Sequence, residues 1–183
     1  SGGRLQNMDK IGRVVALGAS NLTRGFHTIV SAARSAWGAE VQILAALGHG
    51  RSYGAFSRVA FRTLPGILQS GLWRTLESLP PAHTRALITD VGNDILYGHS
   101  DEQILAWVDE AVCRLQSHTS DIVLTDLPLA SIQRLSSRKF LIFRTMLFPF
   151  SHLSLTEVVR KVEQLNALLA GLAVARSLKF FQL

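Results

Sequence analysis

A repeating pattern of short apolar runs, glycine-containing loops and amphipathic helices constrains this chain most strongly. The pattern begins at residues 11–17, an apolar run typical of a buried strand that is broken by Gly18. Apolar side chains then recur at helical spacing as far as Trp37, and Gly38 ends the predicted helix. Strands alternating with helices of this length predict a parallel sheet with helices on both faces. Four further strands are predicted at residues 41–47, 85–89, 122–124 and 178–183.

The chain has 183 residues, of which 48% are hydrophobic, so it is long enough for one domain with its own core. We place this domain at residues 11–183 and expect residues 1–10, which start with Ser1 and not with Met, to be a tag remnant or a disordered N-terminus. A signal peptide and a transmembrane run are both missing from the pattern. We therefore expect a cytoplasmic protein without stable membrane insertion.

The formal net charge of +6 would allow binding to nucleic acid, but Lys and Arg are scattered in runs no longer than pairs such as Arg138-Lys139. A solvated basic surface and no nucleic-acid partner are therefore expected.

The single cysteine, Cys113, excludes an intramolecular disulfide and is predicted to be a buried thiol within a helix. Leucines at positions 64, 68, 72 and 76 indicate another helix, which Pro80 and Pro81 close.

Ser20 stands where the first predicted helix begins, at the carboxyl end of the first strand. Ligands of open α/β sheets bind at this edge, and the unpaired N–H groups of a helix start favour a developing negative charge. Ser20 is therefore a candidate nucleophile beside an anion site. The alternative is structural, because serine is also a preferred N-cap residue.

Two more polar loops follow strands, at residues 48–54 and 90–94. A parallel sheet brings the carboxyl ends of its strands to one edge, so Ser20, Gly50 and Asn93 are predicted to gather there. Acyl transfer needs such a group, because a tetrahedral oxyanion must be held by donors, each worth about 10²–10³ in rate.

The three loops carry the residues on which a family resemblance rests. Residues 18–22 are Gly-Ala-Ser-Asn-Leu, residues 48–52 are Gly-His-Gly-Arg-Ser, and residues 91–94 are Val-Gly-Asn-Asp. In this order they resemble the first three sequence blocks of the SGNH (GDSL-type) hydrolases, which are esterases and lipases. The resemblance implies a flavodoxin-like, three-layer α/β/α fold with a five-stranded parallel sheet, and hydrolysis of carboxylic esters without a cofactor.

The resemblance also implies roles for individual residues. Ser20 would be the nucleophile, and its own backbone N–H would be one oxyanion donor. Gly50, with Gly48 as the fallback, would supply a second N–H, and the Asn93 side-chain amide would be the third donor.

This chain departs from the family pattern in two ways. Ala19 stands where the family has aspartate, and Val91 stands where the third block has its first glycine. The family's Asp-x-x-His block, which supplies the catalytic base, is not found; its expected place, after the last helix and strand, would lie beyond Leu183. We therefore expect that the chain is truncated at its C-terminus or that the base is lost, with weak or no turnover in this form.

Histidines elsewhere are considered as substitutes for that base. His49 and His99 lie in or just after the loops of the predicted site, although capping or surface roles are the commoner explanation. His152 precedes a long helix and resembles the family histidine only superficially, so we reject it.

Other functional classes fit less well. The glycines lack the Gly-Lys-Ser/Thr ending of a P-loop, and no histidines have the spacing of a metal site, so no metal is expected. The main alternative to an esterase is a catalytically inactive α/β protein that binds a small ester or acylated ligand. The apolar residues 129–151 could form a lid, a partner surface or a packed loop, and they would allow a homo-oligomer.

Overall fold

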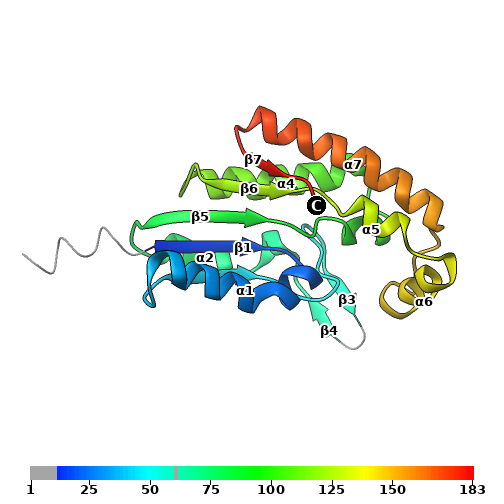
Figure 1. The fold of residues 1–183 in the computed structure, drawn as a ribbon, viewed down its shortest axis with the longest axis horizontal. Helices are drawn as coiled ribbons and strands as arrows, with labels where there is room; N and C mark the ends of the chain where they lie inside the picture. Colours follow the sequence, from blue (N-terminus) through cyan, green and yellow to red (C-terminus); the bar gives the residue numbers. More distant parts are fainter. Residues whose placement is uncertain (1–11, 60–61) are drawn as a thin grey trace, which may run out of the picture.

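The computed structural model describes residues 12–59 and 62–183, so the predicted tag remnant or disordered segment at residues 1–10 lies outside the described residues. The five predicted strands form one sheet in which all neighbours are parallel. Its order is β2 (Gln42–Ala46), β1 (Gly12–Leu17), β5 (His83–Ile88), β6 (Ile122–Thr125) and β7 (Lys179–Phe181). The α/β architecture with a five-stranded parallel sheet is therefore confirmed (Figure 1).

Helices flank this sheet. Their bounds are α1 (Ser20–Trp37), α2 (Leu72–Ser78), α3 (Asn93–Leu96), α4 (Asp101–Gln116), α5 (Leu129–Gln133), α6 (Ser137–Leu147) and α7 (Leu155–Ala175), with a 3₁₀ turn at Ile67–Gln69. Figure 1 shows α5 and α6 at the end of the molecule toward which the strand arrows point. None of the helices within the described ranges is both long and apolar enough to cross a bilayer.

The main core lies between one sheet face and helices α4 and α7. Alternate strand residues such as Val15, Ile88 and Leu124 are fully buried there, because successive strand side chains point to opposite faces. Both helices begin at serine N-caps. The Ser100 hydroxyl accepts the Gln103 N–H at 3.2 Å, and Ser154 forms a complete capping box with Glu157.

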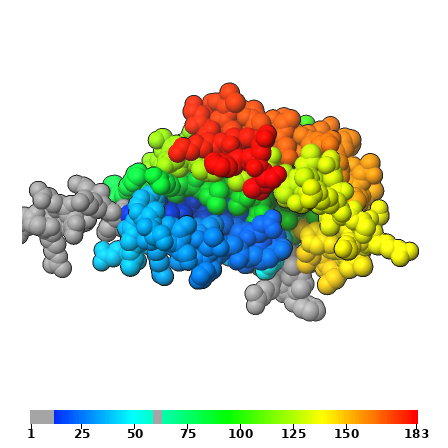
Figure 2. All heavy atoms as spheres, viewed as in Figure 1, coloured from blue at the N-terminus to red at the C-terminus, as the bar shows by residue number. Residues whose placement is uncertain are grey.

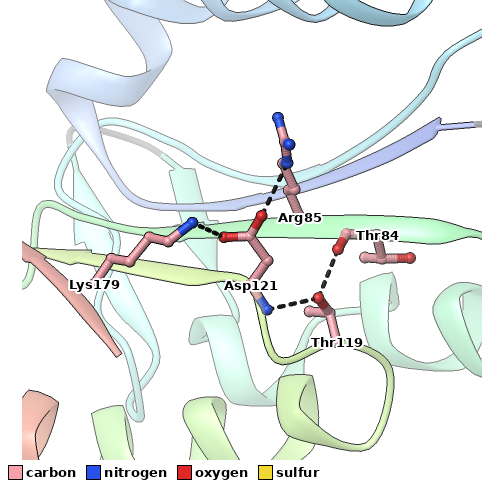
Figure 3. Close-up of polar contacts among 5 residues, drawn as sticks. All are labelled: Thr84, Arg85, Thr119, Asp121 and Lys179. Carbon is pink, nitrogen blue, oxygen red and sulfur yellow. Dashed lines mark hydrogen bonds and ion pairs between the residues drawn. The ribbon is translucent and has the colours of Figure 1, made fainter. Parts of the chain in front are cut away.

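Polar contacts join three strands near the amino end of the sheet (Figure 3). The Asp121 carboxylate accepts the Lys179 ammonium at 2.6 Å and pairs with the Arg85 guanidinium at 2.9 Å. The Thr119 hydroxyl donates to the Thr84 carbonyl at 2.6 Å and accepts the Asp121 N–H at 2.9 Å. The turn before β6 is thus tied to both neighbouring strands, although the exposed ion pairs contribute little to stability.

Two local predictions are wrong. The helix predicted from the leucine spacing is a 3₁₀ turn followed by α2, and Leu64 lies instead in β4 (Arg62–Leu64), which pairs antiparallel with β3 (Ser57–Val59). Cys113 is exposed, because the inward face of α4 is already filled by branched aliphatic side chains such as Val112. The prediction for Cys113 rested on the usual burial of a thiol within a helix, and it is wrong because this residue lies outside the buried face of α4.

Candidate active site

The turn that presents Ser20 depends on close packing around Gly18. The Gly18 N–H donates to the Ala46 carbonyl at 3.0 Å, which continues the β1–β2 pairing into the turn. A Cβ atom on Gly18 would lie 2.9 Å from side-chain atoms of Leu22 and Thr89, so only glycine allows this approach. Ser20 is consequently the first residue of α1, half-buried at the carboxyl edge of the sheet.

The cap of α1 comes from another loop. Ala19, not Ser20, is the N-cap residue, and it offers no side-chain hydrogen bond. Asp90, which follows β5, fills that role: its Oδ2 accepts the N–H groups of Ala19 at 3.0 Å and Leu22 at 2.8 Å, and its Oδ1 accepts the Asn21 side-chain amide at 2.9 Å. Asp90 has a φ of 58°, a left-handed conformation that Asp adopts more readily than most residues.

This contact changes the expectation for the helix start. The sequence predicted open N–H donors beside Ser20, but Asp90 uses two of them and places a carboxylate against the positive end of α1. Ser20 therefore does not act as the cap residue, and the anion site at the helix start is partly filled by the protein itself.

The loops that carry Gly50 and Asn93 are hydrogen-bonded to each other. The Tyr97 hydroxyl donates to the Gly50 carbonyl at 2.7 Å, and the Asn93 Nδ2 donates to the Arg51 carbonyl at 3.3 Å. Gly50 has a φ of 65°, which favours glycine at this position. The two predicted loops thus meet at the sheet edge, as the parallel topology requires.

Tyr53 anchors these loops to the sheet. Its buried hydroxyl donates to the Thr89 carbonyl at 2.6 Å and contacts the Leu17 carbonyl at 3.2 Å, at the ends of β5 and β1. Burial, with the nearby Asp90 and Asp94 carboxylates, raises the pKa of Tyr53 well above its usual value, so this hydroxyl stays a donor.

Asp94 supports the same loop from the interior. Its Oδ2 accepts the Tyr53 N–H at 2.9 Å, and its side chain is fully buried. Burial raises the pKa of Asp94 to about 6, although hydrogen bonds with Ser52 and Tyr53 oppose that shift. Asp94 therefore has a structural role here, because it holds the loop that carries Tyr53.

A cavity of about 210 Å³ opens beside Ser20. Ser20 and Asn93 both line it, together with Asp90 and Asp126, whereas Gly50 and Gly48 are not among its lining residues. Apolar side chains from α3, α5, α6 and α7 and their connecting loops form most of the wall: Leu96, Leu127, Pro128, Ile132, Leu135, Phe140, Phe143, Val158 and Val162. An uncharged, apolar group would fit this wall best, with its polar end at Ser20.

The wall after β6 is held by α7. The Asn166 side chain accepts the Leu127 N–H at 2.8 Å and donates to the Leu127 carbonyl at 3.0 Å. One amide thereby satisfies both polar groups of a loop residue, and this fixes the loop against the helix.

Histidines lie elsewhere. Among the described residues that line the cavity there is no histidine. His49 is exposed in its turn, and His99 packs edge-on against Trp107, with its Nδ1 3.2 Å from the Gln103 side-chain oxygen. Neither of the proposed substitutes for the base therefore reaches the cavity beside Ser20.

Residues 12–59 and 62–183 also contain no cluster of three His, Cys, Asp or Glu side chains suited to a metal ion.

Sequence reasoning missed the roles of Asp90 and Tyr53. The alanine at position 19, which leaves α1 without a cap of its own, is the signal that could have directed attention to Asp90.

Comparisons with known proteins agree on the architecture. No protein-family model matches the chain, and no curated protein matches it either. Solved structures do match. A carbohydrate acetylesterase family member from Sinorhizobium meliloti aligns with a TM-score of 0.59 at 17% identity over 93% of this chain and 82% of that one.

Two further structures carry similar descriptions. AlinE4, a SGNH-hydrolase family esterase, aligns with a TM-score of 0.55 at 17% identity over 92% of this chain and 75% of its own. The psychrotrophic esterase EstA from Pseudoalteromonas sp. aligns with a TM-score of 0.52 at 12% identity over 93% of this chain and 76% of its own. The chain therefore has the SGNH-hydrolase fold that its three loop motifs predicted.

Proposed function

We propose that this protein is a serine hydrolase that cleaves a small carboxylic ester or another acylated molecule, with Ser20 as its nucleophile. One observation carries the proposal: Ser20 and Asn93, from the ends of two different strands, line one cavity whose remaining wall is mainly apolar. The similar folds of proteins described as esterases support the same reaction class.

The reaction assigns a role to each predicted residue. The Ser20 Oγ attacks the acyl carbon, and the alkoxide leaves as an alcohol after taking up the serine proton; water then cleaves the acyl-serine bond and releases the acid. The N–H groups of Ser20 and Gly50 and the Asn93 Nδ2 are the proposed oxyanion donors. The Asn93 Nδ2 makes only a long 3.3 Å hydrogen bond with Arg51, which an oxyanion could replace.

We further propose that turnover by this chain is weak or absent. A serine hydroxyl is a poor nucleophile without a neighbouring base, and no histidine lies among the described residues that line the cavity. The Asp90 carboxylate at the start of α1 adds a negative charge near the site where the oxyanion would form.

Labelling with a fluorophosphonate tests the nucleophile. We expect slow, covalent labelling of the native chain, located by mass spectrometry on the peptide that carries Ser20. Ser20→Ala should abolish it, whereas Ser31→Ala, at an exposed serine on the same helix, should not change it. Labelling that survives Ser20→Ala would refute the assignment.

Added imidazole tests the missing base. Imidazole should accelerate hydrolysis of a short p-nitrophenyl ester by the native chain well above its effect on Ser20→Ala, which measures the reaction of imidazole with the ester in solution. Equal rates for both proteins at every imidazole concentration would contradict the proposal that the lack of a base limits turnover at Ser20. The intact mass of the source protein, compared with the 20.0 kDa of this chain, and assays on both lengths would test the expected truncation.

A ligand-binding protein without turnover is the second candidate. It is favoured by the Asp90 carboxylate, which fills part of the helix start where an oxyanion would be stabilised. This function predicts that an ester ligand binds equally well to the native chain and to Ser20→Ala in calorimetry, with no labelling and no imidazole effect.

A further inference from the structure

The first part of the segment between β6 and β7 has an unusual charge pattern. Residues 127–156 contain four Arg or Lys residues and no Asp or Glu. Arg134, Arg138 and Lys139 are exposed, whereas Arg144 turns inward and donates to the Leu153 carbonyl at 2.8 Å. All the exposed charged side chains of residues 127–156 are therefore positively charged.

The same segment exposes a concentration of large apolar side chains. Those of α6 and its flanks are Leu135, Leu141, Ile142, Phe143, Met146 and Phe150, with exposed fractions from 37% to 87%. Figure 2 shows the yellow and gold atoms of this part of the chain projecting at one end of the molecule. Single exposed apolar residues are ordinary, but a cluster of this size marks an interaction surface.

Basic and apolar side chains share the outward face of α6. Ile142 lies one turn after Arg138, and Met146 lies one turn after Ile142, so the three residues follow one side of the helix. Ile142 is 61% exposed and Met146 is 72% exposed. Long basic side chains beside apolar ones can reach past them with their charged ends, as they do at membrane interfaces.

This surface continues onto the β3–β4 hairpin. A second cavity, of about 420 Å³, has one wall from the end of α6 and the other from β3, with Phe150 and Arg58 among its lining residues. Phe56, just before β3, also lines it; its side chain is 71% exposed and that of Phe150 is 87% exposed. We call α6, residues 148–150 and residues 56–58 the basic apolar tip.

The basic apolar tip adjoins the candidate site. Phe140 and Phe143 of α6 line the cavity beside Ser20, while the opposite side of the same helix is exposed. An acylated molecule held in a lipid layer under the tip would therefore be near the apolar wall of that cavity.

We propose that the basic apolar tip docks on the surface of an anionic lipid bilayer. Its apolar side chains enter the boundary of the acyl chains, and Arg58, Arg138 and Lys139 lie among the lipid phosphates. A second copy of this chain fits the surface less well, because a symmetric contact would bring the same cations face to face.

Vesicle co-sedimentation tests this proposal. The full chain should bind vesicles of phosphatidylcholine with 30% phosphatidylglycerol much more tightly than vesicles of phosphatidylcholine alone, and the binding should weaken with added salt. Arg138→Gln/Lys139→Gln should weaken it by roughly fivefold per charge. Ile142→Ser/Met146→Ser should reduce it at least tenfold, because two anchors are removed.

Matched controls carry the same changes elsewhere. Arg34→Gln/Arg74→Gln removes two exposed charges from α1 and α2, and Val174→Ser removes an 82% exposed apolar side chain from α7. The controls should lose much less binding than the tip variants, and thermal unfolding verifies that all the variants are folded. Ser20→Ala should bind vesicles like the native chain, so this test does not depend on the proposed chemistry.

Several results would overturn the proposal. These are no binding to the anionic vesicles, equal binding to both vesicle types, or tip variants that bind no more weakly than their controls. Sedimentation velocity distinguishes a protein interface: a concentration-dependent dimer that Ile142→Ser/Met146→Ser abolishes, without vesicle binding, would identify a contact between copies of this chain instead.

Discussion

The Asp90 carboxylate accepts the backbone N–H of Ala19 at 3.0 Å, which ties the end of β5 to the start of α1. The same oxygen accepts the Leu22 N–H at 2.8 Å, so one side chain performs the capping role that α1 lacks in its own sequence. The resemblance to SGNH hydrolases places an aspartate at position 19, where this chain has a fully buried alanine. In this protein the carboxylate near Ser20 belongs to Asp90, in the loop that follows β5.

Removing that carboxylate should destabilise the protein. Asp90→Gly tolerates the φ of 58° but accepts no hydrogen bond, so we expect a loss of about 1–2 kcal/mol in the free energy of unfolding. Asp90→Asn also tolerates the backbone and keeps one acceptor oxygen, so it should lose less. Urea unfolding measures both, and equal stability of Asp90→Gly and the native chain would show that the cap is dispensable.

The buried Tyr53 hydroxyl should matter more than the Tyr97 hydroxyl. Tyr53→Phe removes a donor from the fully buried contact with the Thr89 carbonyl, and a loss of about 1–3 kcal/mol is expected. Tyr97→Phe, which removes the hydrogen bond to Gly50 at a half-buried position, is the matched control. Urea unfolding of both variants decides the order, and a larger loss for Tyr97→Phe would contradict it.

Asp94 should make stability depend on pH. Its pKa is raised to about 6 from 3.8 in the unfolded chain, so the folded protein binds this proton more tightly. The stability that Asp94 contributes is therefore full below about pH 4 and is lost as the pH rises through about 6, a change of about 3 kcal/mol. Asp94→Asn stays neutral and keeps an acceptor for the Tyr53 N–H. The variant should therefore lack this pH dependence of the unfolding free energy.

The measurement is the difference in unfolding free energy between the native chain and Asp94→Asn from pH 4 to pH 7. The native chain should lose stability relative to the variant as the pH rises. Glu40→Gln, which removes an exposed carboxylate, controls for the loss of one charge. A difference that stays constant across this range would contradict the raised pKa.

Two glycines near Ser20 should respond oppositely to alanine. At Gly18 a Cβ would lie 2.9 Å from Leu22 and Thr89, so Gly18→Ala should cost about 1–3 kcal/mol. At Gly25, within α1, nothing lies within 4 Å, and Gly25→Ala should stabilise the protein by up to about 1 kcal/mol through helix propensity. Thermal unfolding checks both, and destabilisation by Gly25→Ala would contradict the open space around it.

The fold followed closely from local pattern. The apolar runs, each bounded by glycine or polar residues, predicted every strand of the five-stranded sheet, because a buried strand needs a short continuous apolar stretch. The β3–β4 hairpin was missed because its strands are three residues long and carry no alternation. The helix predicted over that region relied on leucines that the structure divides between a strand and a helix.

The candidate site was predictable only in part. That Ser20 and Asn93 face one cavity follows from topology, since parallel strands bring their carboxyl ends together. Whether Ser20 acts as a nucleophile, and Gly50 as an oxyanion donor, stays a prediction. The structure does settle that His49 and His99 lie away from the cavity, a matter of loop direction that spacing along the chain does not encode.

The sequence by itself determined the strands of the main sheet and the glycine turn before Ser20, because these depend on residues close together in the chain. That the loops after these strands would meet followed from the parallel topology that the alternating pattern predicts. Only the tertiary structure decided that Asp90 caps α1 from 71 positions away and that the outward face of α6 stays uncovered. The physical reason is the range of the interactions. Periodicity reports which side of an element is buried, but a hydrogen bond between distant loops, or a helix face left without a partner, exists only once the elements are packed.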